Sequence, residues 1–370
     1  MSAKADAHWM ARALRLAERG RYTTHPNPRV GCVLVRDGKV VGEGWHQKAG
    51  QAHAEVLALR AAGAAAAGAT AYVTLEPCAH VGRTPPCVEA LIAADVAGVV
   101  AAMEDPNPRV AGQGLARLRA AGIRVESGFM AHSAARINGG FVSRMRRARP
   151  LVRLKMGASL DGRTAMASGE SRWITGEAAR CDVHRGRAEA GSVLTGVGTV
   201  IADDPSLTVR LPGEWAQPLR IVLDSTLRTP PDARLLSLPG RTLIVTAAAR
   251  GEAWARLEQA GAELVQASAR AGRVDLAAAL RLLAEREVNT VWVECGARLG
   301  GALLQAGLVD EVVLYTAGLV MGQDARSLAE LCGISRLADA PRLAIQDVRC
   351  VGPDLRVAAR PECAARPGSR

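Results

Sequence analysis

The chain has 370 residues, of which 49% are apolar and 22% charged, and its formal net charge is +11. This length predicts two domains, and the composition excludes a mainly disordered chain. Because only 3% of the residues are aromatic and no long apolar run occurs, a base-stacking nucleic-acid surface and a membrane span are both disfavoured. The eight cysteines are scattered and no signal-peptide pattern is seen, so we expect reduced thiols in a cytoplasmic enzyme.

The first part of the chain predicts a sheet covered by helices. Apolar residues at helical spacing predict a helix over 8–20, and Asp37-Gly38 between β-branched runs predicts a hairpin of strands 30–35 and 39–44. Helices are then expected near 53–67, 85–94 and 112–121, in alternation with strands near 71–75, 97–103 and 124–126. This alternation predicts a three-layer α/β unit that ends before residue 146.

The second part predicts another α/β unit. The basic run Arg144-Met145-Arg146-Arg147-Ala148-Arg149 precedes Pro150, and we expect it to form a solvated linker. Strands are expected over 151–156 and near 192–195, 219–223, 242–246, 290–294 and 311–315, with helical patterns between them. We therefore predict one domain over residues 1–146 and a second over 150–362. The positive charge suits a polyanionic partner or a phosphorylated ligand, and an arginine-rich proteome would explain it equally well.

Four residues of the first domain have the pattern of a catalytic zinc site. His53 and Glu55 open a predicted helix, Cys78 follows a strand, and Cys87 opens the next helix. One imidazole and two thiolates suit Zn²⁺, and three protein ligands leave one position open for water. Zinc activates such a water near neutral pH, and Glu55 would carry protons from it to a leaving amine.

The spacing of these residues nearly matches a known signature. The motif H-x-E…P-C-x-x-C marks zinc deaminases, but here eight residues separate Cys78 from Cys87. His80 lies inside this insertion and is an alternative ligand. Buried structural roles for each residue are the other alternative.

Two glycine-containing segments of the second domain are candidates for binding a phosphate. The predicted strand that ends at Glu294 runs into Gly296, Gly300, Gly301 and a helix, which suits backbone amides that approach a phosphate. Close packing would explain these glycines equally well, because they do not form the dinucleotide fingerprint. Gly196-Val197-Gly198-Thr199 is the second candidate.

Taken together, the motifs resemble one family along nearly the whole chain. This family is the bifunctional riboflavin-biosynthesis enzyme, in which a diaminohydroxyphosphoribosylaminopyrimidine deaminase is fused to a 5-amino-6-(5-phosphoribosylamino)uracil reductase. The long spacing before Cys87 belongs to its pattern and argues against a tRNA or DNA deaminase. The segments that carry the resemblance are 24–31, 53–56, 74–87, 105–108, 154–164, 168–175, 202–205 and 293–306.

The resemblance implies the fold, the reactions and the cofactors. A three-layer cytidine-deaminase-like domain would use Zn²⁺ to deaminate 2,5-diamino-6-(5-phosphoribosylamino)pyrimidin-4-one, and Asn27 would lie close to the pyrimidine. A dihydrofolate-reductase-like α/β domain would then use NADPH to reduce the ribosyl group to ribityl. Residues expected to face the cofactor are Gly157, Ala158, Trp173, Thr199, Asp203, Ser225, Gly296, Gly300 and Gly301. Residues expected to face the substrate are Ser171, Arg187, Leu207, Arg210 and Glu294.

Several residue roles in the reductase domain follow from side-chain chemistry. Arg187 and Arg210 suit a ribose phosphate, which arginine can bind through two parallel hydrogen bonds. Lys155 and Asp203 are candidates for placing and protonating the sugar carbonyl, although a structural ion pair would explain them equally well. We expect a homo-oligomer without nucleic-acid or membrane partners. The rival hypotheses are a single-step RNA deaminase, which predicts salt-sensitive RNA binding, and a protein without enzymatic activity.

Overall fold

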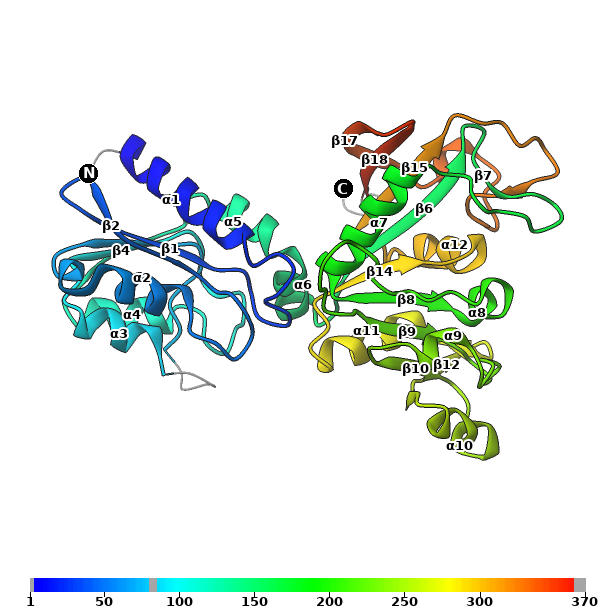
Figure 1. The fold of residues 1–370 in the computed structure, drawn as a ribbon, viewed down its shortest axis with the longest axis horizontal. Coiled ribbons are helices and arrows are strands. Elements are labelled where there is room, and N and C mark those ends of the chain that lie inside the picture. The colour runs from blue at the N-terminus through cyan, green and yellow to red at the C-terminus, as the bar shows by residue number, and fades with distance from the viewer. Residues whose placement is uncertain (1–2, 80–84, 363–370) are drawn as a thin grey trace, which may run out of the picture. The chain divides into compact units, whose positions relative to one another are not determined.

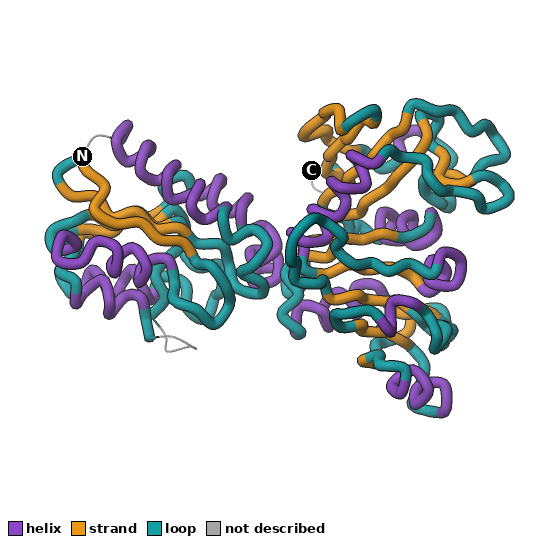
Figure 2. Tube along the Cα trace, viewed as in Figure 1, coloured by secondary structure: helices purple, strands orange, loops and turns teal. Residues whose placement is uncertain are grey.

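The computed structural model describes residues 3–79 and 85–362. By internal contacts the chain divides into two compact units, Met1–Arg149 and Pro150–Arg370. Each unit is a sheet with helices packed against both of its faces (Figures 1 and 2). None of the described helices is long and apolar enough to cross a membrane.

The first unit is built on a five-stranded sheet with the order β2-β1-β3-β4-β5. Strands β1 (Gly31–Arg36) and β2 (Lys39–Trp45) form the predicted antiparallel hairpin. Asp37 and Gly38 at its turn both have positive φ, 51° and 72°, as a tight two-residue hairpin loop requires. Strand β3 (Thr70–Val73) pairs antiparallel with β1, and β4 (Gly98–Ala101) and β5 (Arg124–Ser127) continue parallel to β3.

Helices cover both faces of this sheet, because alternate strand residues point to opposite sides. Cys32 and Leu34 pack with α2 (Ala54–Ala62), the 3₁₀ turn η1 (Gly63–Ala66), α3 (Cys87–Ala93) and α4 (Gln113–Ala120). Val33 and Val35 pack with α1 (Ala3–Glu18), α5 (Ala131–Ile137) and α6 (Gly139–Arg147) on the other face. The predicted three-layer arrangement is therefore confirmed.

The prediction of a solvated linker over 144–149 is wrong. Arg144, Arg146 and Arg147 form the last turn of α6. Phe141 of this helix is buried in the core against α1, and the guanidinium of Arg147 donates to the hydroxyl of Ser143 at 2.6 Å. The arginines raise the polarity of the segment so far that its apolar face was not apparent in the sequence.

The second unit is built on a nine-stranded sheet with the order β11-β10-β9-β8-β14-β6-β15-β18-β17. Its first seven strands are parallel, and the last two form an antiparallel hairpin at one edge. The sequence did not predict this hairpin, because β17 is mostly exposed and lacks apolar alternation. In sheet order the strands are β11 (Glu263–Gln266), β10 (Thr242–Thr246), β9 (Leu219–Leu223), β8 (Ser192–Gly196), β14 (Thr290–Glu294), β6 (Leu151–Ser159), β15 (Glu311–Ala317), β18 (Asp354–Pro361) and β17 (Leu343–Val351).

Helices again cover both faces of this sheet. Val291 and Val293 point toward α11 (Leu276–Glu285) and α12 (Ala297–Gln305), whereas Trp292 packs with α7 (Glu177–Ala190). Helices α8 (Val197–Asp203), α9 (Arg234–Ser237) and α10 (Glu252–Gln259) share the α7 face. Shorter elements are β7 (Arg163–Ala165), β12 (Ala269–Arg270), β13 (Arg273–Val274), β16 (Arg326–Ser327) and η2 (Leu337–Asp339). Ligands of parallel α/β sheets bind beyond the carboxyl ends of the strands, and here β8 and β14 lead directly into α8 and α12.

Candidate active sites

The three predicted metal ligands lie together beyond the carboxyl end of β3, the middle strand of the first sheet. His53 precedes α2, Cys78 follows β3 and Cys87 begins α3. Their ligand atoms lie within 4.8 Å of one another, with His53 Nδ1 3.1 Å from Cys87 Sγ and 3.6 Å from Cys78 Sγ. Ligand atoms bound to a tetrahedral zinc at about 2.0–2.3 Å are separated by about 3.3–3.8 Å. The donor set and its spacing therefore fit zinc, and no other group of described residues meets the same criterion.

The environment of this cluster shifts the pKa of several groups. Glu55 is only 3% exposed, and burial raises its pKa to about 7. The hydrogen bond with Cys87, together with that of His53, lowers the pKa of Cys78 to about 4 although burial opposes this. The site thus combines a thiolate with a carboxyl group that is able to exchange a proton near neutral pH. His80, the alternative ligand, lies outside the described residues.

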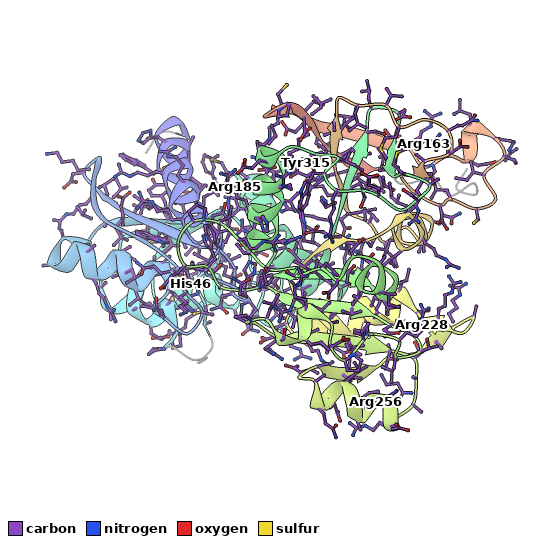
Figure 3. The ribbon with its side chains drawn as sticks, turned by 45° about the vertical axis from the view of Figure 1, so that its right-hand side comes forward. His46, Arg163, Arg185, Arg228, Arg256 and Tyr315 are labelled. Atoms are coloured by element: carbon purple, nitrogen blue, oxygen red, sulfur yellow. The ribbon has the colours of Figure 1, made fainter. Side chains whose placement is uncertain are left out.

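Asn27 contacts a histidine beside the same site, His46, which the sequence analysis missed and which Figure 3 labels. The Nδ2 atom of Asn27 lies 3.1 Å from Nε2 of His46, and Nδ1 of His46 lies 3.3 Å from the carbonyl of Ala52. Because the nitrogen that faces a carbonyl must carry the proton, Nε2 accepts from the Asn27 amide. His46 also contacts the His53 ring edge to face, with 5.3 Å between ring centroids. Its contact with Asn27 joins residues 19 apart in the chain, so no local sequence pattern marks it.

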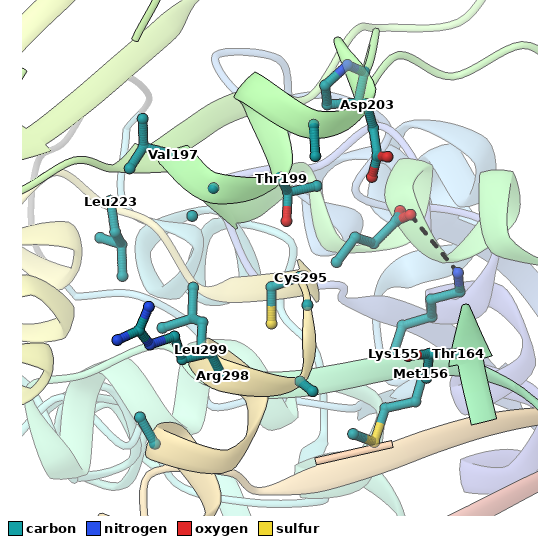
Figure 4. Close-up of a pocket in the computed structure, with 18 of the residues that line it drawn as sticks. Lys155, Met156, Thr164, Val197, Thr199, Asp203, Leu223, Cys295, Arg298 and Leu299 are labelled. Carbon is teal, nitrogen blue, oxygen red and sulfur yellow. Dashed lines mark ion pairs between the residues drawn. The ribbon is translucent and has the colours of Figure 1, made fainter. Parts of the chain in front are cut away.

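The second unit contains a large cavity at the carboxyl ends of its central strands. Its volume is about 1790 Å³, larger than the roughly 300–1,000 Å³ of a typical small-molecule pocket, so it has room for two ligands. Figure 4 shows Thr199, Asp203 and Lys155 among the side chains of this cavity. The predicted residues that line it are Lys155, Gly157, Ser171, Trp173, Arg187, Thr199, Asp203, Leu207, Arg210, Ser225, Glu294 and Gly296.

Three residues predicted to face the cofactor are not among those that line the cavity. Ala158 is 1% exposed within β6. Gly300 and Gly301 lie inside α12, and a Cβ atom on Gly301 would stand 2.0 Å from the carbonyl oxygen of Glu330. Gly301 therefore permits close packing of the helix against that backbone, which is the alternative role left open by the sequence.

An ionic cluster lies at the base of the cavity. The Nε atom of Arg187 lies 2.5 Å from Oε1 of Glu294 and its Nη2 lies 3.0 Å from Oε2, while Nη1 donates to the carbonyl of Thr208 at 2.7 Å. Lys155 Nζ lies 3.9 Å from the same carboxylate (Figure 4). Burial alone would raise the pKa of Glu294, but the charge and hydrogen bonds of Arg187 hold it at about 2. Glu294 is therefore ionised at neutral pH and faces Lys155.

The rest of the cavity wall is strongly basic. Arg210 is exposed, and its Nη1 donates to the hydroxyl of Thr208 at 3.2 Å. Trp173 is 68% exposed and stacks on the guanidinium of Arg180, 4.6 Å from the ring centroid. Such a wall suits ligands that carry phosphates. Further arginines that line it, which the sequence analysis did not single out, are Arg172, Arg228, Arg234, Arg270, Arg273, Arg298 and Arg326.

The fold and the two sites define a class of protein. One His and two Cys beside a buried glutamate, in a unit whose sheet is covered by helices on both faces, form the site of a zinc-dependent deaminase. A parallel sheet with a basic cavity large enough for two ligands is typical of a reductase that uses a nucleotide cofactor. The chain therefore joins a zinc deaminase unit to a reductase unit.

Comparisons with known proteins agree with this class. The family model of the cytidine and deoxycytidylate deaminase zinc-binding region matches residues 3–103, and that of the RibD C-terminal domain matches residues 150–357. The riboflavin biosynthesis protein RibD of Escherichia coli K12 is 52% identical over 366 residues, which cover 95% of this chain and 98% of that protein. RibD of Haemophilus influenzae is 47% identical over 370 residues, which cover 96% and 98%.

Solved structures show the same relationship over both units. A structure of Acinetobacter baumannii RibD is 46% identical and has a TM-score of 0.91, covering 98% of this chain and 100% of that one. The Thermotoga maritima deaminase and reductase is 32% identical with a TM-score of 0.85, covering 97% and 99%. The chain therefore belongs to the RibD family of bifunctional deaminases and reductases of riboflavin biosynthesis. The predicted resemblance, the α/β fold class, both activities and the zinc and NADPH cofactors are thereby confirmed.

Proposed function

We propose that His53, Cys78 and Cys87 hold the zinc ion of the deaminase unit, and that Glu55 is its acid and base. The observation that supports this assignment is the convergence of three ligand atoms within 4.8 Å beside a buried carboxyl group. The substrate is 2,5-diamino-6-(5-phosphoribosylamino)pyrimidin-4-one. One ring amine leaves as ammonia and a carbonyl group takes its place.

Glu55 and Asn27 have separate roles in this step. Zinc, when bound, supplies a Lewis acid that activates water. Glu55 takes one proton from the attacking water and passes it to the leaving amine, and its burial keeps bulk water from exchanging that proton. His46 holds the Nδ2 end of the Asn27 amide, so that the Oδ1 end is turned away from His46 and accepts a hydrogen bond from the pyrimidine.

The second step reduces the opened ribosyl group to ribityl in the cavity of the reductase unit. NADPH, when bound, supplies the hydride. Lys155 and Asp203 place and protonate the sugar carbonyl, and Glu294 holds the Lys155 ammonium group in position. Residues on the cofactor side are Gly157, Trp173, Thr199, Asp203, Ser225 and Gly296.

The substrate occupies the other side of the cavity. Arg210 is exposed there and binds the ribose phosphate, whereas Arg187 chiefly orients Glu294, to which it donates two hydrogen bonds. Ser171 and Leu207 are the remaining residues on the substrate side.

The decisive experiment follows ammonia and NADPH together on the phosphoribosylaminopyrimidine. We expect ammonia release first and NADPH oxidation second, with one NADPH consumed per ammonia released. Ammonia release without NADPH oxidation, accompanied by RNA binding that weakens steeply with salt, would favour the rival RNA deaminase.

We also propose that the chain forms a homo-oligomer and acts in the cytoplasm. Strand β17 is the edge of its sheet and exposes Leu343, Ile345 and Val348 by 40%, 65% and 52%. A sheet edge that exposes three apolar side chains is stabilised when a second copy covers it. Thiolate metal ligands suit a reducing compartment. Light scattering that shows a monomer at micromolar concentration would contradict the oligomer.

A further inference from the structure

Glu76 is a buried carboxylate that no step of the proposed deamination uses. It stands two residues before the metal ligand Cys78, in the segment that follows β3, and is 5% exposed. Its carboxylate accepts four backbone hydrogen bonds, at Oε2 from the N–H groups of Asp105 and Gly112 at 2.9 Å each, and at Oε1 from those of Gly114 at 2.8 Å and Leu115 at 3.3 Å.

Three of these bonds, from Gly112, Gly114 and Leu115, satisfy N–H groups at the N-terminus of α4. The first N–H groups of a helix have no partner within the helix, and leaving them buried and unpaired destabilises the fold. The N-cap residue Gly112 has a φ of 78° and no side chain to act as a cap. A carboxylate offers about four acceptor positions and is favoured by the positive end of the helix dipole. Glu76 thus caps α4 from a different element.

The backbone of α4 also lies directly against the residue between Glu76 and Cys78. A Cβ atom on Gly114 would stand 2.0 Å from the carbonyl oxygen of Pro77. On the other side, the N–H group of Cys87 donates to Sγ of Cys78 at 3.4 Å, and the N–H group of Val88 donates to the Cys78 carbonyl at 3.3 Å. The residues just before Cys78 are therefore fixed by α4, and Cys78 itself is bonded by the backbone of α3.

We infer that Glu76 is a positioning residue of the metal centre, an inference that rests on the proposed zinc site. By fixing residues 76–78 on the first turn of α4, it sets the place of the Cys78 sulfur relative to His53 and Cys87. Groups that orient metal ligands in this way typically change metal affinity by about 10- to 100-fold when they are removed.

The test compares Glu76→Gln with the parent protein after zinc is replaced by Co²⁺. Absorption bands of thiolate-bound Co²⁺ report the coordination geometry. Glutamine keeps the size of the side chain but turns an NH₂ group toward backbone N–H donors. We expect shifted or weaker bands and a loss of about 10- to 100-fold in metal affinity, measured by chelator competition. NADPH oxidation on the deaminated substrate should stay at the parental rate.

Two further variants make the test specific. Glu89→Gln is the matched control, because Glu89 also contacts α4, through Arg117 at 3.0 Å, but on the exposed side. It should leave the bands and the metal affinity unchanged. Glu76→Asp keeps the charge but is one methylene shorter, so it reaches the same amides only by drawing Cys78 toward α4, and its bands should shift.

The outcomes separate the inference from the assignment on which it rests. Parental bands and affinity in both Glu76 variants would overturn the positioning role. Failure of both variants to fold would also overturn it, because Glu76 would then support the fold rather than the metal. A parent protein that binds no metal would instead overturn the proposed zinc site.

Discussion

The two sites of this chain are built in opposite ways. In the deaminase unit three ligand atoms gather within 4.8 Å at the ends of short segments, and Glu55 beside them is buried. In the reductase unit a cavity of about 1790 Å³ is lined by strand ends and loops drawn from most of the unit. A metal centre is specified by a few atoms, whereas a cavity for two ligands is specified by backbone shape and by many weak contacts. Mutations should therefore act sharply in the first site and by degrees in the second.

The sharpest expected effect is loss of the metal. A Cys78→Ala, Cys87→Ala double variant keeps one of three ligands, so elemental analysis should find no zinc where the parent chain holds one ion. Ammonia release should fall to background, while NADPH oxidation on the deaminated pyrimidine should continue. Zinc content equal to the parent would show that the ion is held elsewhere.

The next largest effect is expected when the proton carrier Glu55 is changed while the zinc ligands are kept. Glu55→Gln keeps the size of the side chain but cannot exchange a proton, so ammonia release should fall by about 10²- to 10⁴-fold. Zinc should stay bound, and the reductase rate on deaminated substrate should be close to parental. Glu43→Gln is the control, because Glu43 pairs with Arg12 on the same unit, away from the metal ligands. Loss of NADPH oxidation in folded Glu55→Gln would mean that the two sites are not independent.

The contrast also explains what the sequence could predict. His53, Glu55, Cys78 and Cys87 occur at readable spacing, because helix N-termini and a strand end deliver them from short segments. Two supporting residues were missed. Glu76 acts on backbone amides far along the chain, and His46 acts through Asn27, so neither contact has a local pattern.

The reductase cavity was harder to predict for a physical reason. Strands β8 and β14 could be placed from their apolar runs, but the cavity wall comes from loops whose course depends on tertiary packing. Residues such as Ser171 and Leu207 were assigned only through resemblance to the family. Gly301 shows the limit of that approach, because its small size serves packing against Glu330.

A smaller effect is expected when the partly buried ion pair is broken. Arg187→Ala leaves the Glu294 carboxylate without its main partner, which should lower the free energy of unfolding of the reductase unit by about 2 kcal/mol. Denaturant unfolding measures this loss, and Arg187→Lys should recover only part of it, because lysine lacks the planar pair of donors. An unchanged free energy of unfolding would contradict this role.

The same pair predicts a pH dependence. The pKa of Glu294 is lowered to about 2, below its ordinary value of about 4.3. The ion pair between Arg187 and Glu294 therefore stabilises the folded reductase unit fully above about pH 4.3, and this stabilisation is lost as the pH falls toward 2. The stability difference between the parent and Arg187→Ala should narrow over that range. A stability difference that does not change with pH would mean that Arg187 does not lower the pKa of Glu294 in the folded protein.

The smallest expected effect is at Arg210, where the cavity is open to solvent. An exposed guanidinium that binds a phosphate contributes about 1.5 kcal/mol, so Arg210→Ala should raise KM for the deaminated phosphoribosyl substrate by roughly tenfold. Stability and KM for NADPH should not change.

Arg256→Ala is the matched control, since Arg256 is an exposed arginine on α10 outside the cavity (Figure 3). Repeating the measurement with substrate that lacks the phosphate completes a thermodynamic cycle, and the Arg210 effect should then vanish. An equal loss for both substrates would show that Arg210 shapes the cavity and does not bind the phosphate.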